Sequence, residues 1–260
     1  MRKPHAAGWT SDSPTSAQLS EFFKQVESGR ITKPVLQEFL REGLVLSEAE
    51  QLAAEILGPG KVLGYKDVCC ARKFDIPTNE PELKFDSGSV EDVLREAAEA
   101  NAAGTANWRL GFVTGLDLRL QRKVMGWNRK KQPCFDPDYN WWLEPQQDAW
   151  ANQGLEPGYR LFDFTKNFSS LRWEVQGEKI SAIGNQFVRA EEQAVTEICF
   201  SNFLLNKGER LLPDWYHWGH LQTAFGLRVC VGGFDEDGFD VIYNWPDLSD
   251  GILGVVVARK

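Results

Sequence analysis

The hydrophobic pattern changes its period along this chain, and that change limits the folds available to it. In residues 15–58, apolar side chains recur every three or four positions, which is typical of helices with one buried face. In residues 155–260, short runs alternate apolar and polar side chains, which is typical of strands. We therefore expect an α+β protein with a helical N-terminal half and a small antiparallel sheet towards the C-terminus.

Four regions are expected along the chain. They are a disordered tail (1–14), a helical headpiece (15–58), a mixed α/β middle region (59–154) and a C-terminal domain (155–260). Within the last region, we expect two helices between the first strand and the small sheet, the second being one long helix over residues 186–205 with an apolar stripe on one face.

The headpiece is expected to contain three short helices. Thr32 caps the second, which ends at Gly43, and Ser47 with Glu50 forms the capping box of the third. The first helix carries the apolar stripe Leu19, Phe22, Phe23 and Val26 and ends at Gly29.

Basic residues concentrate in one short segment, although the whole chain carries a net charge of −8. Residues 107–131 hold seven basic residues and one acidic residue, and the regions on either side are acidic. Such a basic island can bind a phosphate or a nucleic acid, with Trp127 as a stacking residue, or it can be the solvated face of a helix and loop. The candidate phosphate-binding residues are Arg119, Arg122, Lys123, Arg129, Lys130 and Lys131.

The five cysteines favour a reducing compartment, because only Cys69 and Cys70 lie close together and adjacent cysteines rarely form a structural disulfide. We therefore expect a cytoplasmic protein. The first fourteen residues contain no apolar segment of a secretion signal. No stretch approaches the roughly 18 apolar residues of a membrane span, so no membrane association is expected.

No motif of a common enzyme class occurs in this sequence: there is no nucleophile elbow, phosphate-binding loop or dinucleotide fingerprint. His217 and His220 would point to opposite faces of a strand, so we expect no metal site and no cofactor. An enzyme would have to use His217 with a carboxylate such as Asp214 or Asp240. The acidic segment at residues 235–238 is expected to form a hairpin turn rather than a calcium loop.

A polar-aromatic loop follows the strand expected at residues 240–245, and loops of this composition are common at binding surfaces. Tryptophan supplies a large contact area together with a polar N–H group. The candidate ligand-binding residues are Tyr243, Asn244, Trp245, Asp247, Ser249 and Asp250, supported by Trp215 and Trp218.

The end of the chain resembles C-type-lectin-like domains of the kind found in formylglycine-generating-enzyme-like proteins and in the variable proteins of diversity-generating retroelements. The segment Arg228–Gly233 is similar to the family's R-V-x-x-G-G strand, and Gly254–Arg259 is similar to its closing G-F-R-x-x-R strand. The resemblance implies a C-type-lectin-like module over residues 155–260, in which the polar-aromatic loop displays the ligand-contacting residues.

Two features separate this chain from catalytic and calcium-binding members of that family. Cys199 and Cys230 are the only cysteines of the region, and both lie in apolar patterns, so we expect no cysteine oxidase. The order Asn244-Trp245-Pro246-Asp247 differs from the Trp-Asn-Asp triplet of calcium-dependent lectins. The run Phe22–Thr32 resembles uncharacterised proteins of candidate-phyla bacteria and implies no function.

Three hypotheses follow from these observations. The first is a non-enzymatic protein that binds another protein or a small polar ligand through the polar-aromatic loop. The alternatives are an enzyme that uses His217, and a nucleic-acid or phosphate binder that uses the basic island.

Overall fold

A computed structural model describes residues 16–32, 46–74, 76–77 and 79–260, and the chain divides into two compact units, residues 1–45 and 46–260. In the first unit, α1 (Ser16–Glu27) ends just before Gly29, whose φ of 71° favours glycine. The first expected helix is therefore confirmed. The expected disordered tail and the helix expected between Thr32 and Gly43 lie outside the described residues.

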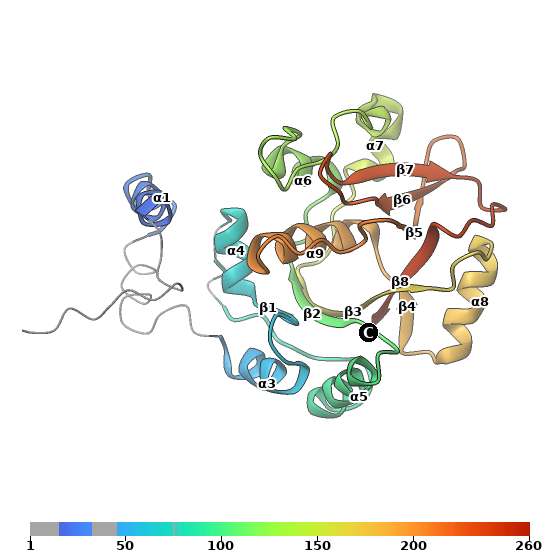
Figure 1. The fold of residues 1–260 in the computed structure, drawn as a ribbon, viewed down its shortest axis with the longest axis horizontal. Coiled ribbons are helices and arrows are strands. Elements are labelled where there is room, and N and C mark those ends of the chain that lie inside the picture. The colour runs from blue at the N-terminus through green and yellow to red at the C-terminus, as the bar shows by residue number, and fades with distance from the viewer. Residues whose placement is uncertain (1–15, 33–45, 75, 78) are drawn as a thin grey trace, which may run out of the picture. The chain divides into compact units, whose positions relative to one another are not determined.

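The second unit contains both helices and strands, so the α+β class is confirmed. The described strands form one mixed eight-stranded sheet in the order β1-β2-β3-β8-β5-β6-β7, with β4 also pairing with β8 (Figure 1). The strands are β1 (Val62–Leu63), β2 (Trp108–Val113), β3 (Gly158–Asn167), β4 (Phe187–Arg189), β5 (Tyr216–Gln222), β6 (Arg228–Gly232), β7 (Asp240–Asn244) and β8 (Leu253–Arg259). The helices are α3 (Glu48–Leu57), α4 (Tyr65–Arg72), α5 (Val90–Ala102), α6 (Leu118–Met125), α7 (Asp148–Ala151), α8 (Trp173–Ile183) and α9 (Glu192–Leu205), with 3-10 turns η1 (Trp141–Leu143) and η2 (Pro145–Gln147).

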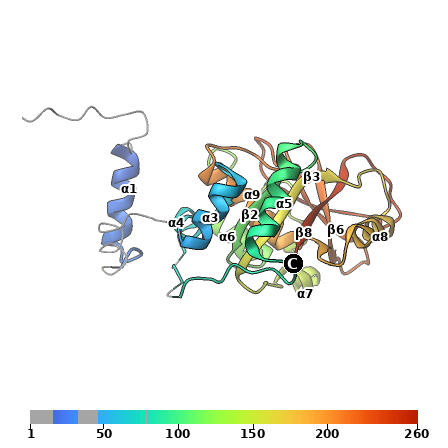
Figure 2. The ribbon, with the colours of Figure 1, turned by 90° about the horizontal axis from the view of Figure 1, so that it is seen from below.

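Strands β2 and β3 separate two groups of buried apolar side chains. Leu110, Phe112 and Leu161 pack with the apolar side chains of α3 and α5. Val113 and Phe162 belong to a larger cluster on the opposite face, called the main core below, because successive side chains of a strand alternate between faces. Helices α3 and α5 therefore cover one face of these strands and α9 covers the other, as Figures 1 and 2 both show.

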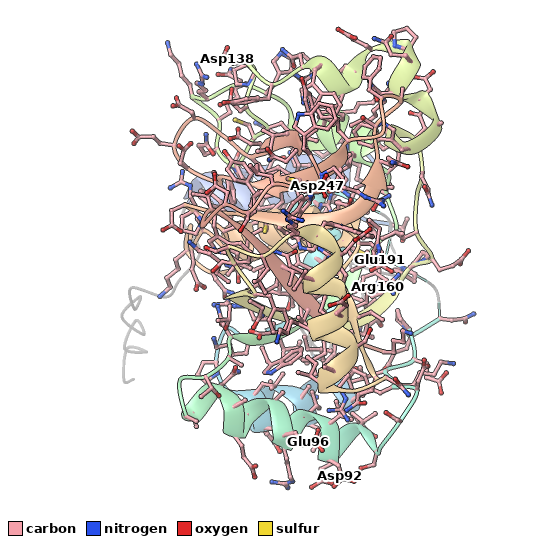
Figure 3. The ribbon with its side chains drawn as sticks, turned by 90° about the vertical axis from the view of Figure 1, so that its right-hand side faces the viewer. Asp92, Glu96, Asp138, Arg160, Glu191 and Asp247 are labelled. Atoms are coloured by element: carbon pink, nitrogen blue, oxygen red, sulfur yellow. The ribbon has the colours of Figure 1, made fainter. Side chains whose placement is uncertain are left out.

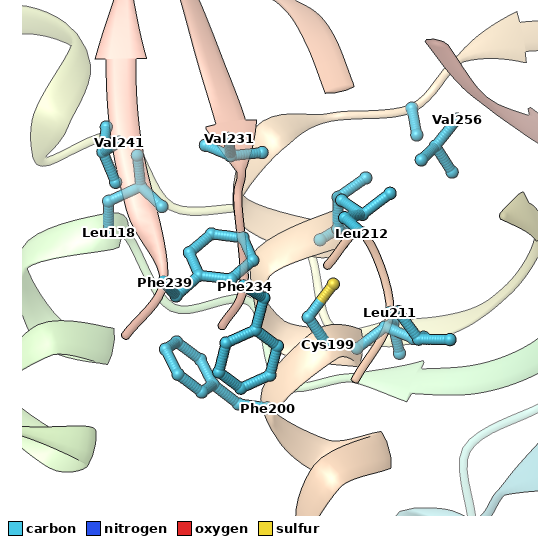
Figure 4. Packing of buried hydrophobic residues seen from close by; sticks show 14 of the residues in the cluster. Leu118, Cys199, Phe200, Leu211, Leu212, Val231, Phe234, Phe239, Val241 and Val256 are labelled. Carbon is cyan, nitrogen blue, oxygen red and sulfur yellow. The ribbon is translucent and has the colours of Figure 1, made fainter. Parts of the chain in front are cut away.

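Helix α9 is buried on all sides over most of its length, and every residue from Glu192 to Asn202 is buried. It contacts α4, β1 and β2, and it also contacts β5 and β6. Phe200 packs against Phe234 and Phe239, which lie on the connection between β6 and β7 (Figure 4). The expectation of a single apolar stripe on this helix is therefore corrected, because neighbours surround it.

Two glutamates of α9 are fully buried. Glu197 forms an ion pair with Arg72 of α4, which is also buried, and accepts hydrogen bonds from the backbone N–H groups of Thr114 (3.1 Å) and Gly115 (3.3 Å). Glu192 accepts a hydrogen bond from the backbone N–H of a β5 residue (2.6 Å), and burial raises the pKa of its carboxyl to about 7. Buried charges require such partners, because transfer out of water is costly.

Strand β8 joins segments that we expected to lie in separate regions. It pairs antiparallel with β3 and with β4, and parallel with β5. The sheet is continuous from β1 to β7, so the expected boundary between residues 154 and 155 falls between strands of one sheet. The two regions share one sheet because β2 pairs with β3. Without β2, that edge of β3 would expose unpaired backbone N–H and C=O groups. The expected headpiece is likewise divided, because α3 lies in the second compact unit.

Short-range predictions largely agree with the structure. Ser47 and Glu50 form the expected capping box of α3. The expected hairpin turn joins β6 to β7, where the N–H of Asp235 donates to the carbonyl of Gly238 (3.1 Å). The long helix expected over residues 186–205 is instead β4 followed by α9, because the first residues of that range pair with β8.

Several charged side chains are exposed on the outside of these layers, among them Asp92 and Glu96 of α5 and Asp138 (Figure 3). Glu96 of α5 forms an ion pair with Arg259 of β8, and Arg160 of β3 lies 3.7 Å from Glu191, the residue before α9. No helix in the described part of the chain is both long enough and apolar enough to cross a membrane.

Candidate functional site

A cavity of about 350 Å³ lies beside the ends of β5, β6 and β7. Aromatic side chains dominate its lining, and they come from three segments: η1, the turn between β5 and β6, and the end of β7. We call this cavity the aromatic pocket. It is lined by Trp141, Glu144, Gln147, Thr223, Phe225, Leu227, Tyr243 and Trp245. Small-molecule sites in proteins usually have this concave and mostly apolar character.

Strand β7 positions two of the aromatic residues by simple alternation. Val241 and Tyr243 share one face of the strand, and Val241 belongs to the main core. Trp245 follows at the same spacing, so the core face of β7 continues into the pocket. Tyr243 and Trp245 are 47% and 69% exposed. They are the two predicted ligand-binding residues that the structure brings together.

Trp141 connects η1 to β7 and forms a wall of the aromatic pocket. Its indole N–H donates to the carbonyl of Val241 (2.7 Å). Its ring meets the ring of Tyr243 edge to face, with centroids 4.6 Å apart and planes at 83°. Its ring also packs against Trp150 of α7, with centroids 5.5 Å apart. These contacts hold the wall in place before any ligand arrives.

A tight turn presents Phe225 at the rim of the pocket. The hydroxyl of Thr223 accepts hydrogen bonds from the N–H groups of Phe225 (3.2 Å) and Leu227 (3.1 Å), and the N–H of Thr223 donates to the carbonyl of Leu227 (2.8 Å). Gly226 adopts a φ of 82°, which allows the chain to reverse here. Phe225 is 72% exposed, so this turn holds a large apolar ring in solvent.

Gln147 links the wall to that turn. Its side-chain oxygen accepts from the indole N–H of Trp150 (2.8 Å) and from the backbone N–H of Ala224 (3.1 Å). Because both partners are donors, the orientation of the amide is defined. The side-chain nitrogen of Gln147 is buried and has no partner among the described residues.

Glu144 is the only charged residue among those that line the pocket. The guanidinium of Arg119 approaches it from outside and donates to the backbone carbonyl of Glu144 (2.9 Å). The charge of Arg119 is compensated by an ion pair with Asp148 (2.6 Å). The charge that the pocket presents to a ligand is therefore negative.

Two further predicted ligand-binding residues lie outside the aromatic pocket. Asn244 points to the opposite face of β7 from Tyr243, where its side-chain nitrogen lies 3.7 Å from the sulfur of Cys230. Asp247 is exposed on the loop that follows β7 (Figure 3).

Ser249 and Asp250 shape that loop. The hydroxyl of Ser249 donates to the carbonyl of Ser170 (2.5 Å), and the carboxylate of Asp250 accepts from the N–H of Ile252 (3.0 Å). Their observed contacts therefore hold the loop against the segment before α8. Neither residue lines the pocket.

Trp215 and Trp218 are core residues, so neither side chain is placed to contact a ligand at the surface. Their side chains are 5% and 0% exposed. Trp215 belongs to the main core, and Trp218 packs with Cys230 and Leu253. The reason is topological, because β5 lies between β8 and β6 in the middle of the sheet.

His217 is sealed in the protein, with no exposed surface. Its Nδ1 accepts from the backbone N–H of Val256 (2.9 Å), so its Nε2–H donates to the carbonyl of Ala190 (3.0 Å). Burial lowers the pKa of this histidine well below its usual value, which keeps the ring neutral. The enzyme hypothesis required His217 to line a pocket beside a carboxylate, and this position does not meet that condition.

The carboxylates considered as partners of His217 have other surroundings. Asp240 accepts from the hydroxyl of Tyr216 (2.7 Å), and burial raises the pKa of its carboxyl to about 7. Asp214 is exposed on the segment before β5. No hydrogen bond or ion pair within the described residues joins either carboxylate to His217.

The arginines of the basic island make internal contacts. Arg119 pairs with Asp148, Arg122 donates to Asn140, and Arg129 pairs with Asp136, Asp138 and Asp237. Arg122 also lies over the ring of Trp127 (4.6 Å to the centroid). Lys123, Lys130 and Lys131 are exposed and take part in none of these contacts.

Sequence reasoning missed the side of the pocket that η1, η2 and the β5–β6 turn provide. Long-range packing brings this side of the pocket, formed by Trp141, Glu144 and Gln147, next to the end of β7. No local sequence pattern encodes that packing. The one available signal was the high tryptophan content, ten residues in all, to which Trp141 belongs.

Within the described residues, no group of three or more histidine, cysteine, aspartate or glutamate side chains is arranged to hold a metal ion. None of the five cysteines forms a disulfide. No protein-family model matches this chain, and comparisons with curated proteins and with solved structures likewise give no match. The geometry and chemistry of the aromatic pocket are therefore the observations that bear on function.

Proposed function

We propose that this protein binds a small ligand in the aromatic pocket and performs no chemistry on it. One observation carries the proposal: aromatic side chains from three segments surround one cavity, and three of them, Phe225, Tyr243 and Trp245, are exposed there. Exposed large apolar groups that gather at a concavity mark binding sites more often than scattered ones do. The contacts of Trp141 and Gln147 support the proposal, since they pre-organise the cavity and so reduce the entropy lost on binding.

The C-type-lectin-like scaffold remains part of this proposal. The order of elements from β3 to β8 supports it: one strand, two helices with the short strand β4 between them, three antiparallel strands and a closing strand that returns to pair with the first. On this scaffold, the ligand would contact Tyr243 and Trp245 from the polar-aromatic loop and Trp141 and Phe225 from outside it. We do not extend the calcium-dependent sugar binding of such domains to this chain.

Intrinsic fluorescence tests the proposal, because Trp141 and Trp245 both line the pocket. The full chain would be titrated with a panel of saccharides, nucleosides, amino acids and organic ammonium salts. We expect saturable changes in emission with at least one class. Tyr243→Ala and Trp245→Ala should weaken that binding at least about tenfold, the size expected for removing an aromatic anchor.

Trp127→Ala is the matched control, because Trp127 is 53% exposed but lies outside the pocket. The Trp127→Ala variant should bind the ligand with the same affinity as the wild type. Unchanged binding in both pocket variants, or loss of binding in the control alone, contradicts the proposal.

A further inference from the structure

We infer that the aromatic pocket selects a small organic cation with methyl groups on its nitrogen, such as a quaternary ammonium compound. The inference rests on the proposed function and names the ligand class for the same site. Three features of the pocket carry it: the angle between its walls, its charge, and the engagement of several of its polar groups in hydrogen bonds within the protein.

The walls form a corner rather than a slot. The rings of Trp141 and Tyr243 are nearly perpendicular, at 83°, and their centroids are 4.6 Å apart. Trp245 and Phe225 add two further exposed rings to the same cavity. A corner of this kind surrounds a compact, rounded group, whereas two parallel rings would accept a flat one. A trimethylammonium group is compact, and its spread positive charge is attracted to the negative faces of aromatic rings.

The charge of the lining favours the same ligand. Glu144 is the only charged residue that lines the pocket, and the nearby Arg119 is already paired with Asp148. An anion would meet a carboxylate here, and the whole chain adds a net charge of −8. A cation is attracted by both.

Several polar groups of the lining are engaged within the protein, which leaves fewer of them for a saccharide. The indole N–H of Trp141 donates to a backbone carbonyl, and the hydroxyl oxygen of Thr223 accepts two backbone N–H groups. The oxygen of Gln147 also accepts two donors, whereas its nitrogen is buried without a partner among the described residues. A saccharide needs several directional hydrogen bonds in its site, whereas a methylated ammonium ion offers no N–H and requires none.

Calorimetric titration of the full chain with choline tests the inference, and 3,3-dimethylbutan-1-ol is the comparison. The two compounds have nearly the same shape and differ in charge, because carbon replaces the nitrogen. We expect choline to bind at least about tenfold more tightly than the neutral alcohol, and tetramethylammonium to compete with it. Trp245→Ala and Tyr243→Ala should each abolish this preference.

Glu144→Gln isolates the contribution of charge. We expect it to weaken choline binding a few-fold, to reduce its dependence on salt, and to leave binding of the neutral alcohol unchanged. Glu156→Gln is the control, because Glu156 is also exposed but does not line the pocket. Denaturant unfolding of each variant verifies that it is folded.

The outcomes separate this inference from the proposed function. Equal affinity for choline and the neutral alcohol overturns the cation inference, and so does a saccharide that binds through Trp245 while choline does not. Either result leaves the pocket as a binding site. Binding of choline that survives Trp245→Ala and Tyr243→Ala overturns the site itself, and the absence of binding by every compound in the panel overturns both.

Discussion

The rings of Trp141 and Tyr243 meet edge to face, and the same indole donates a hydrogen bond to Val241 on the strand that carries Tyr243. The side chain of Trp141 therefore links β7 to the segment that follows α6, and it forms a wall of the aromatic pocket. The stability of the fold and the shape of the pocket are coupled at this position.

Replacement of Trp141 should reveal that coupling. We expect Trp141→Ala to lower the free energy of unfolding by about 2–3 kcal/mol, somewhat less than for a fully buried tryptophan, because Trp141 is half-buried. Trp141→Phe keeps a ring but loses the hydrogen bond to Val241, so its cost should be about 1 kcal/mol. Urea unfolding measures both values. An alanine variant as stable as the wild type would show that the wall is not held as described.

Gly111 and Ile198 make a second specific contact, between β2 and α9. A Cβ atom on residue 111 would overlap the terminal methyl group of Ile198. We expect Gly111→Ala to destabilise the protein by about 1–3 kcal/mol, the usual range for overpacking. Ile198→Val removes the terminal methyl, so the double variant should be more stable than the sum of the single effects predicts. Strict additivity in denaturant unfolding would contradict this packing.

The buried ion pair of Arg72 and Glu197 should respond asymmetrically to removal of either charge. Glu197→Gln leaves a buried guanidinium without its counter-charge, and we expect a loss of about 3–5 kcal/mol. Arg72→Met leaves the carboxylate with hydrogen bonds from Thr114 and Gly115, so the loss should be smaller. The double variant should cost less than the two single variants together. If Arg72→Met proves the more damaging change, the backbone donors do not stabilise Glu197 as we describe.

Glu192 should make stability depend on pH. Burial raises its folded-state pKa to about 7, above the unfolded value of about 4.3. Between these values the folded state binds more protons than the unfolded state, so this group lowers stability as pH rises from about 4 to about 7. Glu192→Gln removes that titration. The free energy of unfolding of the variant should therefore rise relative to that of the wild type with rising pH, by about 4 kcal/mol above pH 8.

Guanidinium unfolding of the wild type and Glu192→Gln at several pH values measures this difference. Other groups, such as His217, whose lowered pKa costs stability as pH falls, are present in both proteins and cancel. Glu178→Gln on the exposed face of α8 is the control and should show no such trend. A constant difference between Glu192→Gln and the wild type would be inconsistent with a protonated Glu192.

Local features of this protein could be predicted because they depend on neighbouring residues only. The capping box of Ser47 and Glu50 needs just four consecutive residues, and the turn at residues 235–238 needs the backbone preferences of aspartate and glycine. The exposure of Tyr243 and Trp245 agrees with the polar-aromatic composition of their loop, from which both were expected at a surface.

Other properties depend on partners that are distant in sequence. The sequence allows His217 to be a catalytic residue. In the structure, β8 and the segment before α9 enclose it, and both of its ring nitrogens form hydrogen bonds with their backbone groups. Glu192 and Glu197 lie on a helix that was expected to bury only one face, and both are buried because strands and helices surround α9.

The α+β class, several helix ends and the turn at residues 235–238 could be predicted from the sequence, because short-range hydrogen bonding and side-chain periodicity depend on neighbouring residues. Long-range packing brought Trp141, Phe225 and Glu144 into one cavity with Tyr243 and Trp245, and it enclosed His217 in the protein. Burial and long-range pairing change the role of a side chain without changing its identity, so no local pattern could reveal them.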